Sequence, residues 1–149
     1  MNLKSFDDLL RFAIRREADS AAFYRMAAER ANPGIKKAFE ELAIQEDGHK
    51  KNLEQLDLSK YETMDLKEIK GLGLSELLED VPYTLDMDYT DLLRMAIKKE
   101  EKSQKLYASI AKIVSEEKLK TLLLILAKEE STHKEKLEAV YDEEILRDF

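Results

Sequence analysis

Apolar residues recur every three or four positions along four stretches of the chain, which is the pattern of amphipathic helices. The spacing predicts helices over about Phe6–Ala31, Pro33–Leu56, Tyr89–Val114 and Glu116–Tyr141. Ser5 and Ser115 precede the first and fourth helices and suit N-cap positions, whereas Pro33 suits the first turn of the second. The alternation typical of strands is not visible, so we expect an all-α fold.

Glycine and proline residues mark the breaks between these stretches. The pattern divides a single domain, residues 1–149, into a hairpin at about 5–57, a crossover at about 58–88 and a second hairpin at about 89–141. Within the crossover, Ser75–Asp80 is predicted to form a short helix.

The second hairpin repeats the sequence of the first. The segment Phe6–Glu17 matches Tyr89–Glu100, and the segment Leu42–Leu53 matches Leu126–Leu137. We therefore predict a four-helix bundle of two related helical hairpins, joined by one long crossover.

The apolar residues at three- and four-residue spacing form a stripe along one face of each predicted helix, which we expect to face the core. Near the middle of every helix, glutamate or histidine residues interrupt this stripe. The interrupting residues are Glu17 in the first helix, Glu46 and His49 in the second, Glu100 in the third, and Glu130 and His133 in the fourth. Buried carboxylates are costly, and four of them close together would repel one another. Two divalent cations would neutralise four carboxylates, so the pattern predicts a metal centre.

The spacing of the histidines supports this prediction. The chain has 2 histidines, and each follows a glutamate by three residues, which places both side chains on one helix face. In antiparallel hairpins, Glu17 and Glu46 lie at similar distances from the turn at Pro33, so their levels agree to about one helical turn.

Two tyrosines lie two turns after the lone glutamates, on the same helix face. Tyr24 follows Glu17, and Tyr107 follows Glu100. Each tyrosine fits either a plain core position or a position from which its hydroxyl hydrogen-bonds a ligand carboxylate. The neighbouring glutamates at 101 and 129 point off the stripe, and we expect them to be solvated.

Composition excludes several other classes of site. The chain has 0 cysteines, which excludes disulfides, iron–sulfur clusters and cysteine nucleophiles and restricts a metal to oxygen and nitrogen ligands. Its net charge of −7 argues against a nucleic-acid partner. We see no signal peptide and no apolar stretch long enough to span a bilayer, so we expect a soluble cytoplasmic protein.

One Glu on each of two helices and Glu-x-x-His on each of the other two is the pattern of the ferritin-like di-iron carboxylate proteins. With Leu126-Ala127-x-x-Glu130-x-x-His133 and the Glu17-to-Tyr24 spacing, the chain resembles the rubrerythrin branch of that superfamily. The resemblance implies two iron ions. Oxygen ligands with imidazole also suit manganese, and zinc is a further alternative. It also implies that Glu46 and Glu130 bridge or chelate the ions and that Glu17 and Glu100 are terminal ligands.

The resemblance to rubrerythrins implies reduction of hydrogen peroxide. We therefore expect a di-iron oxidoreductase that reduces peroxide or dioxygen. Two departures qualify the resemblance. The chain has no cysteines for a rubredoxin-like domain, so we expect an external electron-donor protein. Ser103 stands where rubrerythrins carry an extra Glu, and the remaining ligands resemble the ferroxidase centre of bacterioferritins.

Three functions therefore stay open. They are peroxide or dioxygen reduction, a ferroxidase or iron-storage subunit, and a metal-binding bundle without turnover. We expect a homodimer, and exchange of a helical hairpin between chains is compatible with the repeat.

Overall fold

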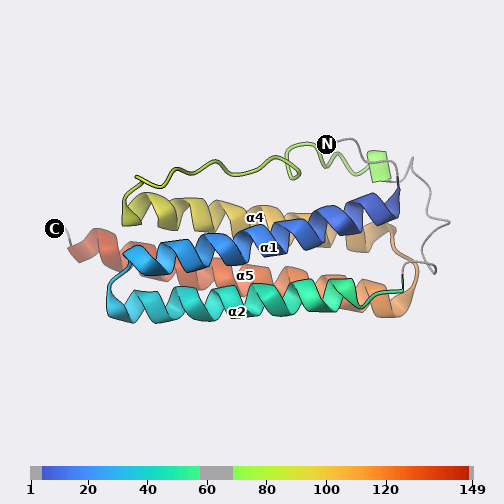
Figure 1. Cartoon of the computed structure of the whole chain (residues 1–149). Helices are drawn as coiled ribbons and strands as arrows, with labels where there is room; N and C mark the ends of the chain where they lie inside the picture. The colour runs from blue at the N-terminus through green and yellow to red at the C-terminus, as the bar shows by residue number, and fades with distance from the viewer. Residues whose placement is uncertain (1–4, 58–68, 148–149) are drawn as a thin grey trace. The chain divides into compact units, whose positions relative to one another are not determined.

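The computed structural model describes residues 5–57 and 69–147. Its long helices are α1 (Phe6–Arg30), α2 (Pro33–Glu54), α4 (Tyr89–Ile113) and α5 (Glu117–Arg147). They divide between two compact units, residues 1–73 with the hairpin α1·α2 and residues 74–149 with the hairpin α4·α5. Figure 1 shows the two helices of each hairpin side by side, joined by a short turn. All four predicted helices and both predicted hairpins are therefore present.

Short polar side chains begin three of the helices. The hydroxyl of Ser5 accepts the Asp8 backbone N–H at 3.1 Å, which confirms the predicted cap of α1. Asn32 caps α2 in the same way, and Pro33 occupies the predicted first turn. Asp88 caps α4, since its carboxylate accepts a backbone N–H three residues on at 2.9 Å. These caps satisfy N–H groups that have no partner inside the helix.

The predicted cap of the fourth helix was wrong. The helix α5 starts at Glu117, so Glu116, and not Ser115, precedes its first residue. The carboxylate of Glu116 accepts the backbone N–H groups of Lys118 at 3.2 Å and Leu119 at 2.8 Å. The longer side chain at 116 therefore takes the role that the sequence pattern assigned to the serine.

Two further predictions of helix extent differ from the structure. The helix α5 continues past Tyr141 to Arg147, because residues 142–147 contain no glycine or proline to stop it. The segment Ser75–Asp80 forms turns and not a helix. Its backbone bonds, such as Leu78 N–H to the Leu74 carbonyl at 3.0 Å, are isolated and do not continue as a helical ladder. The ends of the other helices agree with the predictions to within two residues.

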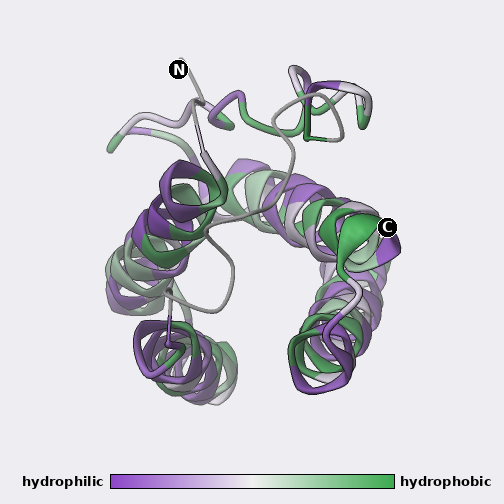
Figure 2. Cartoon of the chain, turned by 90° about the vertical axis from the view of Figure 1, so that its right-hand side faces the viewer, coloured by the Kyte–Doolittle hydropathy of each residue, from purple (hydrophilic) through white to green (hydrophobic). Residues whose placement is uncertain are grey.

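The predicted stripes form the buried side of the helices. These stripes run along one face of each helix, over residues 10–28, 35–56, 93–114 and 119–140. Nearly every stripe position is buried, and only the terminal positions Ile35, Leu56 and Val140 are half-buried. Figure 2 shows the corresponding separation of hydrophilic and hydrophobic residues around the helices. Burial of this apolar side supplies most of the driving force for helix packing.

Part of the predicted crossover, residues 58–68, lies outside the described residues. The described part after Gly73 runs along α4 (Figure 1). There the Lys99 ammonium lies 5.6 Å from the centre of the Tyr83 ring, and Lys102 donates to the Glu79 carbonyl at 2.9 Å. Within the described residues, no helix has the length and apolar character needed to cross a membrane.

Candidate metal centre

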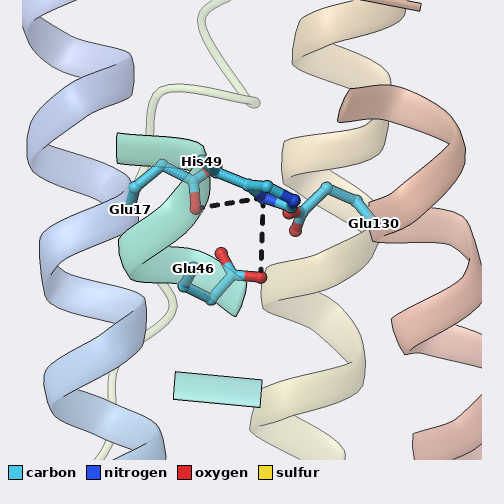
Figure 3. A group of neighbouring side chains, drawn as sticks. All are labelled: Glu17, Glu46, His49 and Glu130. Atoms are coloured by element: carbon cyan, nitrogen blue, oxygen red, sulfur yellow. Dashed lines mark ion pairs between the residues drawn. The ribbon is translucent and has the colours of Figure 1, made fainter. Parts of the chain in front are cut away.

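The first hairpin brings one carboxylate of α1 against a carboxylate and an imidazole of α2. The Nδ1 atom of His49 lies 3.6 Å from Oε2 of Glu17 and 4.0 Å from Oε1 of Glu46. Figure 3 shows these three side chains pointing toward one another. Each is at most 3% exposed, and each offers a ligand atom within 4.8 Å of those of the other two. We call this group the first half-site.

The second hairpin contains the matching group. The Nδ1 atom of His133 on α5 lies 3.5 Å from Oε2 of Glu100 on α4. Glu130 offers a third ligand atom, again within 4.8 Å of the other two. All three side chains are at most 2% exposed. We call this group the second half-site, and its residues correspond one for one to those of the first half-site in the sequence repeat.

The local sequence explains how each half-site forms. Two residues three apart in a helix lie on the same face about one turn apart, so each Glu-x-x-His unit presents a carboxylate and an imidazole together. The antiparallel register then brings in the lone glutamate. Tyr24 stacks on Phe39 with ring centres 5.9 Å apart, and the same register places Glu17, seven residues earlier, beside Glu46, seven residues later.

The chemistry of these groups fits a divalent cation. Carboxylate oxygens with imidazole nitrogen are ligands that iron, manganese and zinc accept. The nitrogen-to-oxygen distances of 3.5 to 4.0 Å exceed the usual hydrogen-bond length. Two ligand atoms that bind the same metal ion at about 2.1 Å lie about 3 to 3.5 Å from each other. The observed distances are close to that separation. A cation would also offset the cost of burying two carboxylates in each half-site.

The neighbouring glutamates have a different environment. Glu129 is exposed, as predicted. Glu101 is half-buried and forms ion pairs with Lys105 at 2.8 Å and with Lys134 on α5 at 3.8 Å. The hydrogen bond from Lys105 is the main cause that lowers the pKa of Glu101, and the charge of Lys134 acts in the same direction. This carboxylate is therefore a surface ion-pair partner.

Both predicted tyrosines lie in the core. Tyr24 and Tyr107 are at most 1% exposed. Tyr24 contacts Phe39 and also meets the Phe23 ring edge-on, with ring centres 5.6 Å apart. Phe23 was not among the predicted stripe residues, because the apolar face of α1 is broader than a single stripe. Ser103, also buried, lies one turn after Glu100.

In the described part of the chain, the clustered groups able to hold a metal ion consist of six residues: Glu17, Glu46, His49, Glu100, Glu130 and His133. These are the residues predicted from the sequence. The geometry therefore adds no further ligand to the predicted set, and it places every predicted ligand in one of the two half-sites.

Comparison with known proteins agrees with this picture. A family model described as Rubrerythrin matches residues 8–71 and 91–147. A solved structure from Thermotoga maritima, provisionally assigned as a ferritin-like diiron-carboxylate protein, is 24% identical, with a TM-score of 0.74 over 97% of this chain and 99% of that chain. No curated protein matches significantly. The structural likeness confirms the predicted all-α, ferritin-like four-helix fold. Because the family model covers most of the sequence, the chain belongs to the rubrerythrin family.

Proposed function

We propose that the protein is a non-haem di-iron redox protein that reduces hydrogen peroxide or dioxygen. The observation that carries this proposal is the pair of matching buried half-sites, each with two carboxylates and one imidazole. Two copies at equivalent positions of a repeated hairpin suit a reaction that moves two electrons.

We further propose that the two half-sites together hold two ions. Glu17 and His49 would bind one ion and Glu100 and His133 the other, and the remaining carboxylates, Glu46 and Glu130, would bridge or chelate them. The four carboxylates would balance the charge of two divalent cations. Iron is the proposed occupant, and manganese and zinc also suit these ligands.

When bound, two ferrous ions supply two electrons, and hydrogen peroxide needs two electrons and two protons to form two water molecules. The protein's part is to hold six ligand groups in a buried position from which bulk water is excluded. Rigid helices fix these groups, and the carboxylates favour the more highly charged form of the metal.

Repeated turnover then requires electrons from outside the chain. The sequence has 0 cysteines, so it cannot hold the cysteine-ligated iron of a rubredoxin-like domain. We propose that a separate electron-donor protein returns two electrons to the centre after each cycle.

Tyr24 and Tyr107 are proposed to orient ligand carboxylates. Helical side chains lean toward the N-terminus, so each tyrosine extends along its helix toward the glutamate two turns earlier. A hydroxyl held there would hydrogen-bond a carboxylate oxygen and fix its direction toward the metal.

One observation favours a second function, oxidation of ferrous iron for storage. Ser103 is buried at the position where rubrerythrins carry an additional Glu, so the ligand set is reduced to four Glu and two His. Storage needs a large shell of subunits. Size-exclusion chromatography with light scattering separates the two proposals, because an assembly of hundreds of kilodaltons would favour storage and a monomer or dimer would exclude it.

Anaerobic loading with ferrous iron, followed by one equivalent of hydrogen peroxide, tests the leading proposal. We expect loss of two ferrous ions for each peroxide consumed, measured with a ferrous-specific chelator and a peroxide assay. Ferrous iron that persists in the presence of peroxide would identify a metal-binding bundle without turnover. A variant with Glu17→Ala and Glu100→Ala serves as the control for iron bound elsewhere on the protein.

A further inference from the structure

Two serines are buried beside the candidate ligands without belonging to them. In the described residues, tyrosines aside, the polar side chains of the core are the six candidate ligands together with Ser20 and Ser103. These serines are 4% and 3% exposed. They occupy matching positions of the sequence repeat, each three residues after the lone glutamate of its hairpin. Each hairpin thus buries one hydroxyl in addition to its two carboxylates and its imidazole.

The helix places each of these hydroxyls between a candidate ligand and a tyrosine. Residues spaced three and four apart share one face of a helix. On α1 this buried face presents, in successive turns, Glu17, Ser20 and Tyr24, and on α4 it presents Glu100, Ser103 and Tyr107. Along the helix axis, each serine lies about 4.5 Å from the lone glutamate. Both hydroxyls are therefore next to a half-site.

An alanine lies across the hairpin from each serine. The register that stacks Tyr24 on Phe39 also sets Ser20, four residues earlier, beside Ala43, four residues later. In the second hairpin, the repeat assigns Ala127 to the position of Ala43, and both alanines are buried. The side chain opposite each hydroxyl is thus a single carbon, which leaves space that a longer side chain would fill.

A helical serine or threonine commonly hydrogen-bonds its own helix, and these two serines do not. Thr132 on α5 shows the common arrangement, because its hydroxyl donates to the Lys128 carbonyl at 3.1 Å. Within the part of the chain that the structure describes, neither Ser20 nor Ser103 forms a hydrogen bond. A buried hydroxyl is costly unless it has a partner. The two serines therefore point to a small polar molecule as that partner.

We propose that Ser20 and Ser103 bind hydrogen peroxide beside the half-sites and so select peroxide over dioxygen as the oxidant. A serine hydroxyl both donates and accepts hydrogen bonds, and hydrogen peroxide does the same. Dioxygen has no proton to donate, so a hydroxyl does little to hold it. The identity of the oxidant rests on the proposed function, whereas the two hydroxyl positions do not. In the absence of peroxide, we expect a buried water at each position.

Crystal structures of the zinc-loaded protein test these positions without any redox reaction. We expect an ordered water about 2.5 to 3.0 Å from the Oγ atom of each serine. The water should be missing beside the changed residue in Ser20→Ala and in Ser103→Ala. A hydroxyl that bonds a helix carbonyl in place of a water would overturn the proposal.

Zinc affinity separates oxidant binding from positioning of the ligands. Competition with a chelator should give the same affinity for the wild type, Ser20→Ala and Ser103→Ala, because the proposed hydroxyls hold the oxidant and not the ligand carboxylates. A clear fall in zinc affinity would overturn the proposal in favour of a hydroxyl that orients a ligand.

Stopped-flow oxidation of the ferrous-loaded protein then compares the two oxidants. In S20A/S103A, we expect the half-maximal rate to require about tenfold more peroxide, with the maximal rate and the reaction with dioxygen unchanged. The control is Ser109→Ala, which changes a half-buried serine of α4 and should alter neither reaction.

The outcomes separate this proposal from the proposed function. Wild-type protein that does not react with peroxide would refute both. A peroxide reaction that S20A/S103A leaves unchanged, or that slows equally with dioxygen, would refute only the selection of peroxide by the two serines.

Discussion

At the scale of single residues, burial separates the candidate ligands from the other carboxylates of the described chain. Glu17, Glu46, Glu100 and Glu130 are each 1% exposed, whereas neighbours such as Glu129 face solvent. A carboxylate in such surroundings needs compensation by a nearby cation or strong hydrogen bonds. The residue type alone does not mark a ligand. A glutamate is identified as a candidate ligand by its position on the buried face of a helix, beside an imidazole.

Removing a proposed bridging carboxylate should abolish the paired binding of two ions. We expect Glu46→Ala and Glu130→Ala to lose stoichiometric metal binding, because each change would remove a carboxylate that is proposed to hold both ions. Elemental analysis after dialysis against the metal measures the number of ions per chain. Glu129→Ala, a change of the same size at an exposed neighbour, should keep full binding. Two ions per chain in either ligand variant would contradict the bridging assignment.

The proposed role of the buried tyrosines has its own test. In Tyr24→Phe the ring and its packing on Phe39 are retained and only the hydroxyl is lost. If that hydroxyl orients a ligand carboxylate, metal affinity should fall by about 10- to 100-fold, as measured by competition with a chelator of known affinity. Unchanged affinity would show that the tyrosine acts only as part of the core. Tyr107→Phe asks the same question of the second half-site.

At the scale of secondary-structure elements, each half-site depends on the register of one hairpin. Caps fix where a helix begins, and the packed apolar faces fix which turn of one helix lies beside which turn of the next. Across the second hairpin, the guanidinium Nε of Arg94 on α4 donates to the Tyr141 hydroxyl on α5 at 2.9 Å. The ion pair of Lys134 with Glu101 also joins these two helices. Both contacts lie on the outside and leave the buried face to the ligands.

The cap of α5 gives a stability prediction at this scale. Glu116→Ala should lower the free energy of unfolding by on the order of 1 kcal/mol, because two backbone N–H groups lose their carboxylate acceptor. Ser115→Ala, one residue earlier, is the matched control and should have little effect. Urea denaturation of the metal-free variants measures both changes. A larger effect at 115 than at 116 would restore the serine as the cap.

At the scale of the whole molecule, the two units carry equivalent half-sites but different outer surfaces. The repeat keeps the ligand positions the same in both hairpins. It does not keep the exposed positions, where Glu40 and Glu41 on α2 correspond to Leu124 and Ile125 on α5. The repeat therefore preserves the candidate ligands and does not preserve the outer faces of the hairpins.

Metal binding should stabilise the whole chain. An ion that binds the native state and not the unfolded chain adds about 4 kcal/mol at a free concentration of 1,000 times its dissociation constant. We therefore expect removal of metal by a chelator to lower the Tm by several degrees or more, measured by circular dichroism or calorimetry. Adding the metal back should restore the original value. An unchanged Tm after complete removal would contradict a preformed buried site.

The sequence by itself determined the helices, the buried faces and the identity of the candidate ligands. These follow from the period of the helix, which is a local property of the chain. Local signals were weaker at helix ends. A polar residue next to the start of a helix is a candidate cap, and only the backbone path decided between Ser115 and Glu116. The short segment Ser75–Asp80 was likewise predicted to be a helix, and the structure showed turns in its place.

Only the tertiary structure decided which side chains meet across helices and which remain exposed. The contact of His49 with Glu17 joins residues on two helices, so it depends on hairpin register and not on spacing within one helix. The exposure of Leu124 and Ile125 depends on packing in the same way. In the apolar run 122–127, hydrophobicity is uniform, and burial of one side against α4 left the other side facing outward. Periodicity assigns a residue to a face, but packing decides what that face contacts.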